Sequence, residues 1–310
     1  MLVFRIEVAH AFVAFCREFV FHKVVFLPLL PISVIVTEMP DSNEQKKETD
    51  IKPRTVGGKV LNLYKQMGET PSERLERLRA QKPEYAREVL SYAGRLDPMA
   101  EGVMITLVGS ANKMREAYLD MSKEYVLDIL FGFATDTYDV LGRIMENGDT
   151  TSGLTKKTID QGLNEFRGHV SQEYPPFSSK AVEGKPLFQW ARMGAISSLV
   201  LPKKTVTIYD ITLQGIYKIK EPALLAYIEA GIDKVHGDFR QEEIMMGWKR
   251  ALRSNGEREF PCATVKISCS SGTYARSIAH GLGQDLGIPA LALHILRTKV
   301  GDYEASKSLK

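Results

Sequence analysis

The chain has 310 residues, of which 25% are charged and 44% belong to the hydrophobic set, and its formal net charge is +3. This length suits one large domain, or one domain with a small appendage, and the composition is that of an ordinary soluble protein. The mild net charge neither requires nor excludes a nucleic-acid partner, because such a partner needs only a local basic face. Three cysteines at irregular spacing argue against a disulfide framework and favour a cytoplasmic location.

The first 55 residues read as an extension and linker outside the folded core. Residues 1–36 are rich in Val, Phe and Leu, but charged residues interrupt them and prolines divide the apolar run 24–36. This run is too short to span a membrane as a helix, so we expect no membrane role. Residues 38–54 are polar and charged, as linkers are.

Residues 70–73, Thr-Pro-Ser-Glu, form a capping box with proline at the first helical position. They predict a helix that runs to about Leu90, and its mixed charges favour a solvated surface over a basic RNA-binding face. Beyond it, Asp97 precedes Pro98, which disfavours helical geometry at the preceding residue. We therefore expect Asp97 in a turn or extended segment, followed by a strand over 103–108.

The remainder of the chain mixes strand-like and helical patterns. Strands are expected at 125–131, 206–219 and 263–269, and helices at 155–168, 186–192, 238–253 and 273–286. In the helix 238–253, Ile244, Trp248 and Leu252 share the face expected to point inward. Because strands and helices do not alternate regularly, the pattern favours an α+β fold over a doubly wound parallel sheet.

The most informative motif is residues 92–102, Tyr-Ala-Gly-Arg-Leu-Asp-Pro-Met-Ala-Glu-Gly. Read alone, Asp97 would be an ordinary turn aspartate, since Asp-Pro is common in turns. The segment, however, closely resembles the Gly-Thr-Leu-Asp-Pro-Leu-Ala-Ser-Gly stretch of the TruB family of RNA pseudouridine synthases. In that family the aspartate is the catalytic nucleophile, so the resemblance implies this role for Asp97.

Further segments resemble motifs of the same family, in the same order along the chain. They are residues 62–71 (Leu-Asp-Lys-Pro-x-Gly-x-Thr), 123–125 (Lys-x-Tyr), 132–142 (Gly-x-x-Thr-Asp-Thr-x-Asp-x-x-Gly), 175–187 (Pro-Pro-x-Tyr-Ser-Ala…Gly-Lys-x-x-Tyr), 271–278 (Gly-Thr-Tyr-Ile-Arg-Ser) and 293–297 (Leu-x-Arg). Together these matches extend from about residue 60 to residue 300. The family resemblance implies the pseudouridine synthase fold, a bent, mostly antiparallel sheet flanked by helices with a central active-site cleft, over residues 56–310.

The resemblance also implies roles for single residues. Arg276 matches the arginine that pairs with the aspartate, and a two-pronged guanidinium would fix the carboxylate's orientation. Tyr125 matches the active-site tyrosine, whose ring could stack on a uracil and whose hydroxyl could help to move a proton. Leu296 is expected as an apolar wall of the pocket, and Lys65 matches the lysine of the first motif and is expected to bind substrate.

Four features depart from the family pattern. Tyr92 stands where the family often has histidine, and Arg95 replaces a small residue, so that it could contact a phosphate or form a structural ion pair. Residues 232–261 exceed what the family usually carries there and are expected to be an inserted surface element. The chain ends soon after Arg297, so we expect no C-terminal RNA-binding domain.

The family resemblance implies a tRNA pseudouridine synthase that isomerises uridine 55 of the T arm. The nucleophile could attack C6 of the base or C1′ of the ribose. The reaction requires no cofactor and no metal, and the expected partner is the T-arm stem-loop of tRNA, with no obligate protein partner. Two alternatives stay open: a noncatalytic RNA-binding or RNA-folding protein on the same scaffold, and a synthase that acts on another structured RNA.

Overall fold

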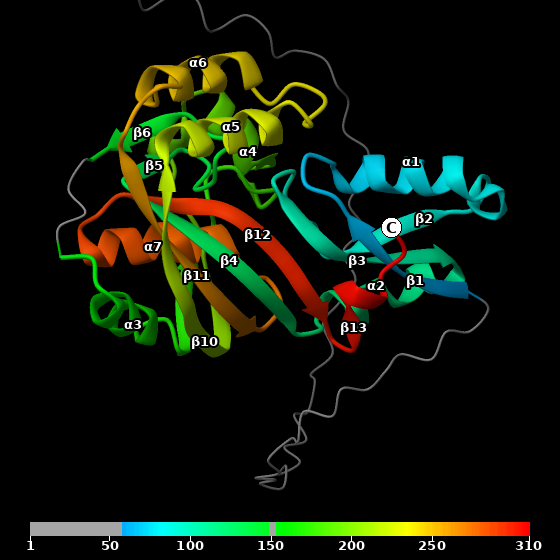
Figure 1. The fold of residues 1–310 in the computed structure, drawn as a ribbon. Helices are drawn as coiled ribbons and strands as arrows, with labels where there is room; N and C mark the ends of the chain where they lie inside the picture. Colours follow the sequence, from blue (N-terminus) through cyan, green and yellow to red (C-terminus); the bar gives the residue numbers. More distant parts are fainter. Residues whose placement is uncertain (1–57, 149–152) are drawn as a thin grey trace, which may run out of the picture. The chain divides into compact units, whose positions relative to one another are not determined.

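A computed structural model describes residues 58–148 and 153–310 of the chain, so the expected N-terminal extension lies outside the described residues. Within the described part, nine strands form one sheet, along the path β1-β3-β12-β4-β11-β10-β7, with β2 beside β3 and β13 beside β12 (Figure 1). These strands are β1 (Gly58–Lys65), β2 (Leu90–Ala93), β3 (Ala100–Gly109), β4 (Lys123–Phe131), β7 (Gly168–Glu173), β10 (Lys203–Lys220), β11 (Glu259–Cys269), β12 (Ala290–Val300) and β13 (Tyr303–Glu304).

Helices and short hairpins surround this sheet. The helices are α1 (Pro71–Gln81), α2 (Arg115–Leu119), α3 (Lys156–Asn164), α4 (Leu187–Arg192), α5 (Glu221–Ile232), α6 (Gln241–Ala251) and α7 (Ala275–Leu286). The hairpins pair β5 (Phe133–Thr135) with β6 (Ile144–Asn147), and β8 (Ala181–Val182) with β9 (Lys185–Pro186). The expected α+β class, with a mostly antiparallel sheet flanked by helices, is confirmed. No helix of the described residues has the length and apolar character needed to cross a membrane.

Two parts of the sheet meet where β3 runs parallel to β12. This joint comprises three residue pairs, Ala100 with Ile295, Glu101 with Leu296, and Gly102 with Arg297. Gly102 adopts φ +109°, and a Cβ built on it would lie 2.2 Å from the carbonyl oxygen of Arg297. Glycine is therefore required at this position, because both the backbone conformation and the close approach of β12 exclude a side chain.

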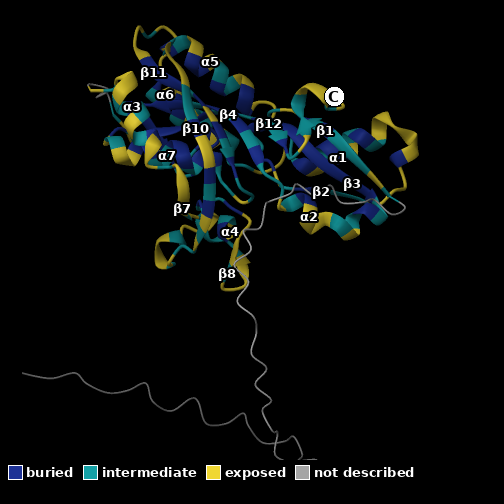
Figure 2. Ribbon diagram, turned by 90° about the horizontal axis from the view of Figure 1, so that it is seen from below, coloured by how far each residue is buried: buried dark blue, intermediate teal, exposed yellow. Residues whose placement is uncertain are grey.

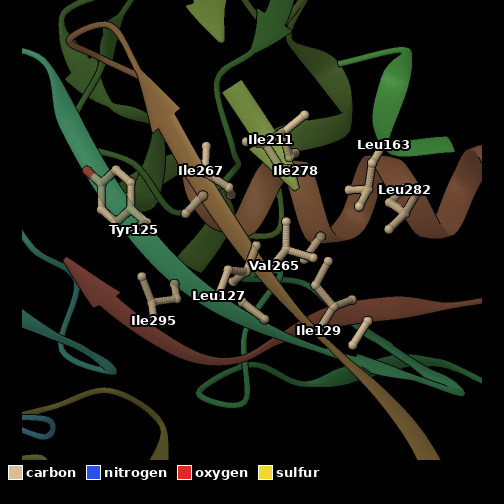
Figure 3. Close-up of a cluster of buried hydrophobic side chains, with 14 of the residues drawn as sticks. Tyr125, Leu127, Ile129, Leu163, Ile211, Val265, Ile267, Ile278, Leu282 and Ile295 are labelled. Carbon is tan, nitrogen blue, oxygen red and sulfur yellow. The ribbon is translucent and has the colours of Figure 1, made fainter. Parts of the chain in front are cut away.

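Apolar side chains cover both faces of the central strands, because successive residues of a strand point to opposite faces. On one face, Leu127, Val265 and Ile267 pack against Ile278 and Leu282 of α7 (Figure 3). Tyr125 and Ile295 lie at one end of this cluster (Figure 3). The opposite face packs against α5 and α6, and Figure 2 shows buried residues gathered along the strands, with exposed residues on the outer sides of the helices.

Helix α1 begins as its capping box predicts but ends earlier. Thr70 Oγ1 accepts from the Glu73 amide at 3.2 Å, and the Glu73 carboxylate accepts from the Thr70 amide at 2.6 Å. The helix ends at Gln81, not near Leu90, because Pro83 excludes helical geometry at the residue before it. Leu90 instead begins strand β2.

Helix α6 is part of the packed core. Ile244, Trp248 and Leu252 are buried as expected, and the Trp248 indole donates to the carbonyl of Val140 at 3.0 Å. The helix begins at Gln241, three residues after the expected start at 238, and Arg240 before it adopts a left-handed conformation with φ +65°. Helix α5 was not predicted from the sequence, because its apolar residues do not form a single face.

Candidate active site

The turn that carries Asp97 lies between β2 and β3, and the buried Lys65 side chain holds it through hydrogen bonds. Lys65 Nζ donates to the carbonyls of Gln66 at 2.9 Å, Pro98 at 3.2 Å and Ala100 at 2.5 Å. Lys65 is fully buried, and burial lowers the pKa of its amine to about 7. Lys65 therefore supports the backbone next to Asp97, and it does not belong to the residues that line the cavity described below.

Arg276 binds the Asp97 carboxylate through two hydrogen bonds. Its Nε lies 2.7 Å from Oδ2 and its Nη2 lies 3.3 Å from Oδ1. The same guanidinium donates to the carbonyl of Thr137 at 2.7 Å and to that of Phe177 at 2.9 Å. Arg276 stands in the first turn of α7, two residues after the Ser-Gly-Thr-Tyr segment, and is almost completely buried. One side chain thus joins the Asp97 turn to two further segments of the chain.

A second carboxylate, that of Asp139, is buried and interacts electrostatically with Arg276. Its Oδ1 accepts from the hydroxyl of Thr137 at 2.7 Å and from the amide of Leu141 at 3.0 Å. The pKa of Asp139 is raised to about 6, chiefly by burial, while the charge of Arg276 lowers it and the charge of Asp97 raises it. The sequence motif 132–142 contains this residue, but no sequence signal indicated that it approaches Arg276.

Asp97, Arg276 and Tyr125 all line one cavity of about 760 Å³. Tyr125 comes from β4, where it pairs with Arg297 of β12. Both residues are buried and line the cavity, and we call this buried part of its wall the cavity floor. Burial raises the pKa of the Tyr125 hydroxyl to about 12, which keeps the phenol neutral and able to donate a hydrogen bond at physiological pH. The structure therefore places together the three residues expected to be catalytic, although they come from different parts of the sequence.

Tyr92 and Arg95, the two departures from the family pattern near Asp97, also line this cavity. The Arg95 guanidinium donates to the hydroxyl of Ser179 and, at 3.4 Å, to that of Tyr92. The Arg95 side chain is exposed, so its contacts are with hydroxyls at the mouth of the cavity and not with a buried carboxylate. A phosphate group could reach it there.

Leu296 lies outside the set of residues that line the cavity, whereas its neighbours Ile295 and Arg297 belong to it. Alternation along β12 explains this, because residues 295 and 297 share one face of the strand. Arg297 is buried and donates to the carbonyls of Val103 at 2.8 Å and Gly94 at 3.0 Å. It therefore supports the segment leading to Asp97, a role that the sequence motif did not indicate.

These groups form a cavity lined by apolar and polar side chains, in which the buried Arg276 orients the Asp97 carboxylate and the Tyr125 phenol belongs to the same lining. Such an arrangement can hold a planar base and present an oxygen nucleophile to it. A family model described as TruB family pseudouridylate synthase (N terminal domain) matches residues 82–236, half of the chain. The chain belongs to this family.

Curated proteins of the same family are similar over most of this chain. A tRNA pseudouridine synthase B from Caldanaerobacter subterraneus is 28% identical over 249 residues, which are 80% of this chain and 71% of that protein. The proteins of the same name from Bacillus pumilus and Bacillus subtilis are each 30% identical over 244 residues, 79% of this chain and 65% of theirs. The chain thus spans about two thirds of the length of these relatives.

A solved structure titled "Crystal Structure of a Cbf5-Nop10-Gar1 Complex" is also similar, with 21% sequence identity and a TM-score of 0.48. That similarity covers 80% of this chain and 50% of the other.

Proposed function

We propose that this chain is a cytoplasmic tRNA pseudouridine synthase that isomerises uridine 55 in the T arm, with Asp97 as nucleophile. One observation carries the proposal: the Asp97 carboxylate is held by two hydrogen bonds from Arg276 at the wall of a cavity that also contains Tyr125. The names of the relatives, tRNA pseudouridine synthase B, support the substrate class.

The reaction breaks the N1–C1′ bond of uridine, turns the uracil and joins its C5 to C1′. The proton that C5 carries must leave, and N1 gains a proton, so the product is an isomer of the substrate. Asp97 Oδ1 or Oδ2 supplies the nucleophile, either at C6 of the base or at C1′ of the ribose. The neutral Tyr125 hydroxyl lies in the same cavity and is suited to hydrogen-bond the base or to move its proton.

The target uridine must leave its stack before Asp97 can reach it. Extruding a base from a folded RNA costs a few kcal/mol, and stacking on an aromatic ring returns about 1–3 kcal/mol per base. The cavity of about 760 Å³ offers room for a flipped nucleotide, with Tyr125 at its floor and Arg95 at its mouth. Arg95 and Tyr92 are accordingly proposed to contact the RNA next to the flipped base.

The decisive experiment is pseudouridine mapping on an unmodified tRNA transcript incubated with the purified protein, beside Asp97→Asn as a control. Pseudouridine at position 55 with the wild-type protein and none with the variant is the expected result. Pseudouridine at another position would reassign the target. RNA binding without any pseudouridine would favour a noncatalytic RNA-binding protein.

A further inference from the structure

Arg240 contacts the turn 135–143 and the segment 174–180, the two segments that Arg276 joins to the Asp97 turn. Its guanidinium forms a two-pronged ion pair with Asp136, with Nη1 2.7 Å from Oδ2 and Nη2 3.2 Å from Oδ1. The guanidinium carbon also lies 4.3 Å from the centre of the Phe177 ring, a cation–π contact. Arg240 precedes α6, so it reaches the cavity wall from the segment that was expected to be a surface element.

Each partner of Arg240 is directly linked to a partner of Arg276. Asp136 precedes Thr137, whose carbonyl accepts from Arg276 Nη1, and Phe177 offers its own carbonyl to Arg276 Nη2. The two arginines therefore hold the turn 135–143 and the segment 174–180 in common. A shift of either segment would move the acceptors that fix the Arg276 guanidinium, and with it the Asp97 carboxylate.

The Arg240 contacts are well sheltered from solvent. Its side chain is 14% exposed and that of Asp136 is 18% exposed, so both charges are largely removed from water and their pairing has a fixed geometry. A separate ion pair links the segment before α6 to α4, since Arg192 contacts Asp238, two residues before Arg240, at 3.2 Å. Arg240 also keeps a left-handed backbone, with φ +65°, which a non-glycine residue rarely adopts without support from its surroundings.

We propose that Arg240 is a positioning residue of the active site: by holding the turn 135–143 against Phe177, it fixes Arg276 and so orients Asp97. This inference rests on the proposed function for its kinetic consequence, but its structural part does not. Arg240 acts through Phe177 and Asp136, and its guanidinium is already engaged by both. Its loss is therefore expected to slow the chemical step while RNA binding stays unchanged.

The test compares Arg240→Gln with Arg143→Gln. Arg143 forms an ion pair of 2.7 Å with Glu243, which also links the turn 135–143 to α6, but both side chains are 50% exposed. Arg240→Gln is expected to lower the single-turnover rate of pseudouridine formation roughly tenfold to 100-fold, since small misplacements of reacting groups have effects of this size. Its Kd for tRNA and the salt dependence of that Kd are expected to stay at wild-type values. Arg143→Gln is expected to match the wild-type protein in all three.

Three further variants keep the test interpretable. Arg240→Lys retains the charge but not the fork or the planar contact with Phe177, so its rate is expected to lie between those of the wild type and Arg240→Gln. Asp136→Asn combined with Arg240→Gln is expected to be no slower than the slower single variant, because the two residues act as a unit. Should Arg240→Gln fail to fold in a thermal melt, Arg240→Lys and Asp136→Asn carry the comparison.

Amide hydrogen exchange separates this inference from the proposed function. Faster exchange of the amides in 135–143 and 174–180 in Arg240→Gln, but not in Arg143→Gln, is expected whether or not the protein modifies tRNA. Unchanged exchange there, a wild-type rate, or a rate loss explained entirely by weaker RNA binding would overturn the positioning role. A wild-type protein without activity would instead count against the proposed function.

Discussion

The Arg276 guanidinium donates to both carboxylate oxygens of Asp97 from a side chain that is 3% exposed, whereas the Asp97 side chain is 28% exposed. The arginine therefore lies behind the carboxylate, and the carboxylate faces the cavity. A planar fork bound to two oxygens fixes the rotation of the carboxylate as well as its position. The lone pairs of Asp97 that Arg276 does not use are consequently available to a substrate in the cavity.

Asp97→Asn is predicted to abolish pseudouridine formation, by roughly 10⁴-fold or more, the scale on which removal of a nucleophile acts. Asparagine has nearly the same shape, so the fold is expected to persist. RNA affinity should persist too, because phosphate and loop contacts supply most of it. Single-turnover assays with tRNA, together with filter binding, measure both quantities. A variant that turns over near the wild-type rate would remove Asp97 from the nucleophile's role.

Arg276→Lys is predicted to lose most activity and also some stability. Arg276 forms four hydrogen bonds, to Asp97, Thr137 and Phe177, whereas a lysine ammonium has three donors and no planar fork. A buried carbonyl left without a donor costs about 1–3 kcal/mol. Urea unfolding and single-turnover rates test the two effects. Normal turnover by this variant would show that the fork geometry is unnecessary.

Two variants of Tyr125 can separate the contribution of its ring from that of its hydroxyl. Tyr125→Phe keeps the ring at the cavity floor and is predicted to bind tRNA normally, while its rate falls by about 10²-fold if the hydroxyl assists proton transfer. Tyr125→Leu removes the aromatic face as well and is predicted to be slower still. Comparing the rate and the Kd of the two variants identifies the contribution of each group. Equal rates for wild type and Tyr125→Phe would exclude the hydroxyl.

Asp139 gives the unfolding free energy a distinct pH dependence. Its pKa is raised from the ordinary value of 3.8 to about 6 in the folded chain, so the folded state binds the proton more tightly than the unfolded state does. The resulting stabilisation is complete below pH 3.8 and is lost as the pH rises through 6, since the folded state must then bury a charge.

Asp139→Asn removes this titration while the side chain can still accept from Thr137. The stability of the wild type relative to the variant is therefore predicted to fall between pH 4 and pH 6 by up to about 3 kcal/mol, at about 1.4 kcal/mol per unit of pKa shift. Urea unfolding of both proteins at several pH values in this range provides the measurement. Parallel stability curves for the two proteins would contradict the prediction.

Local sequence signals predicted elements where one physical rule acts alone. The capping box at Thr70 predicted the start of α1, and α7 ends at Leu286 as expected, before Gly287 with φ +66°. The end of α1 was predicted too late, because the amphipathic pattern continues past Pro83, whereas this proline disfavours helical geometry at the residue before it. The N-terminus of α6 was missed because Arg240 takes a left-handed backbone that no local rule assigns to arginine.

The candidate site could be predicted only through the motif resemblance. Asp97 and Arg276 are 179 residues apart in sequence, and neither periodicity nor composition indicates that they touch. The burial of Asp139 and the supporting role of Arg297 depend on how strands from distant parts of the chain pack, so no single segment reveals them. Successive residues of β12 point to opposite faces, so Ile295 lies on the same face as Arg297 and Leu296 on the other. Knowing that Arg297 lines the cavity would therefore have assigned Ile295, and not Leu296, to it.

Gly102 has a consequence for how the chain can vary. It belongs to one of the three pairs that join β3 to β12, and any side chain there would meet the carbonyl of Arg297 at 2.2 Å. An alanine would displace Arg297, and with it the donors to the carbonyls of Gly94 and Arg95, in the segment that leads to Asp97. Natural selection on an active protein is therefore expected to be as strict at this residue, which has no functional group, as at the carboxylate itself.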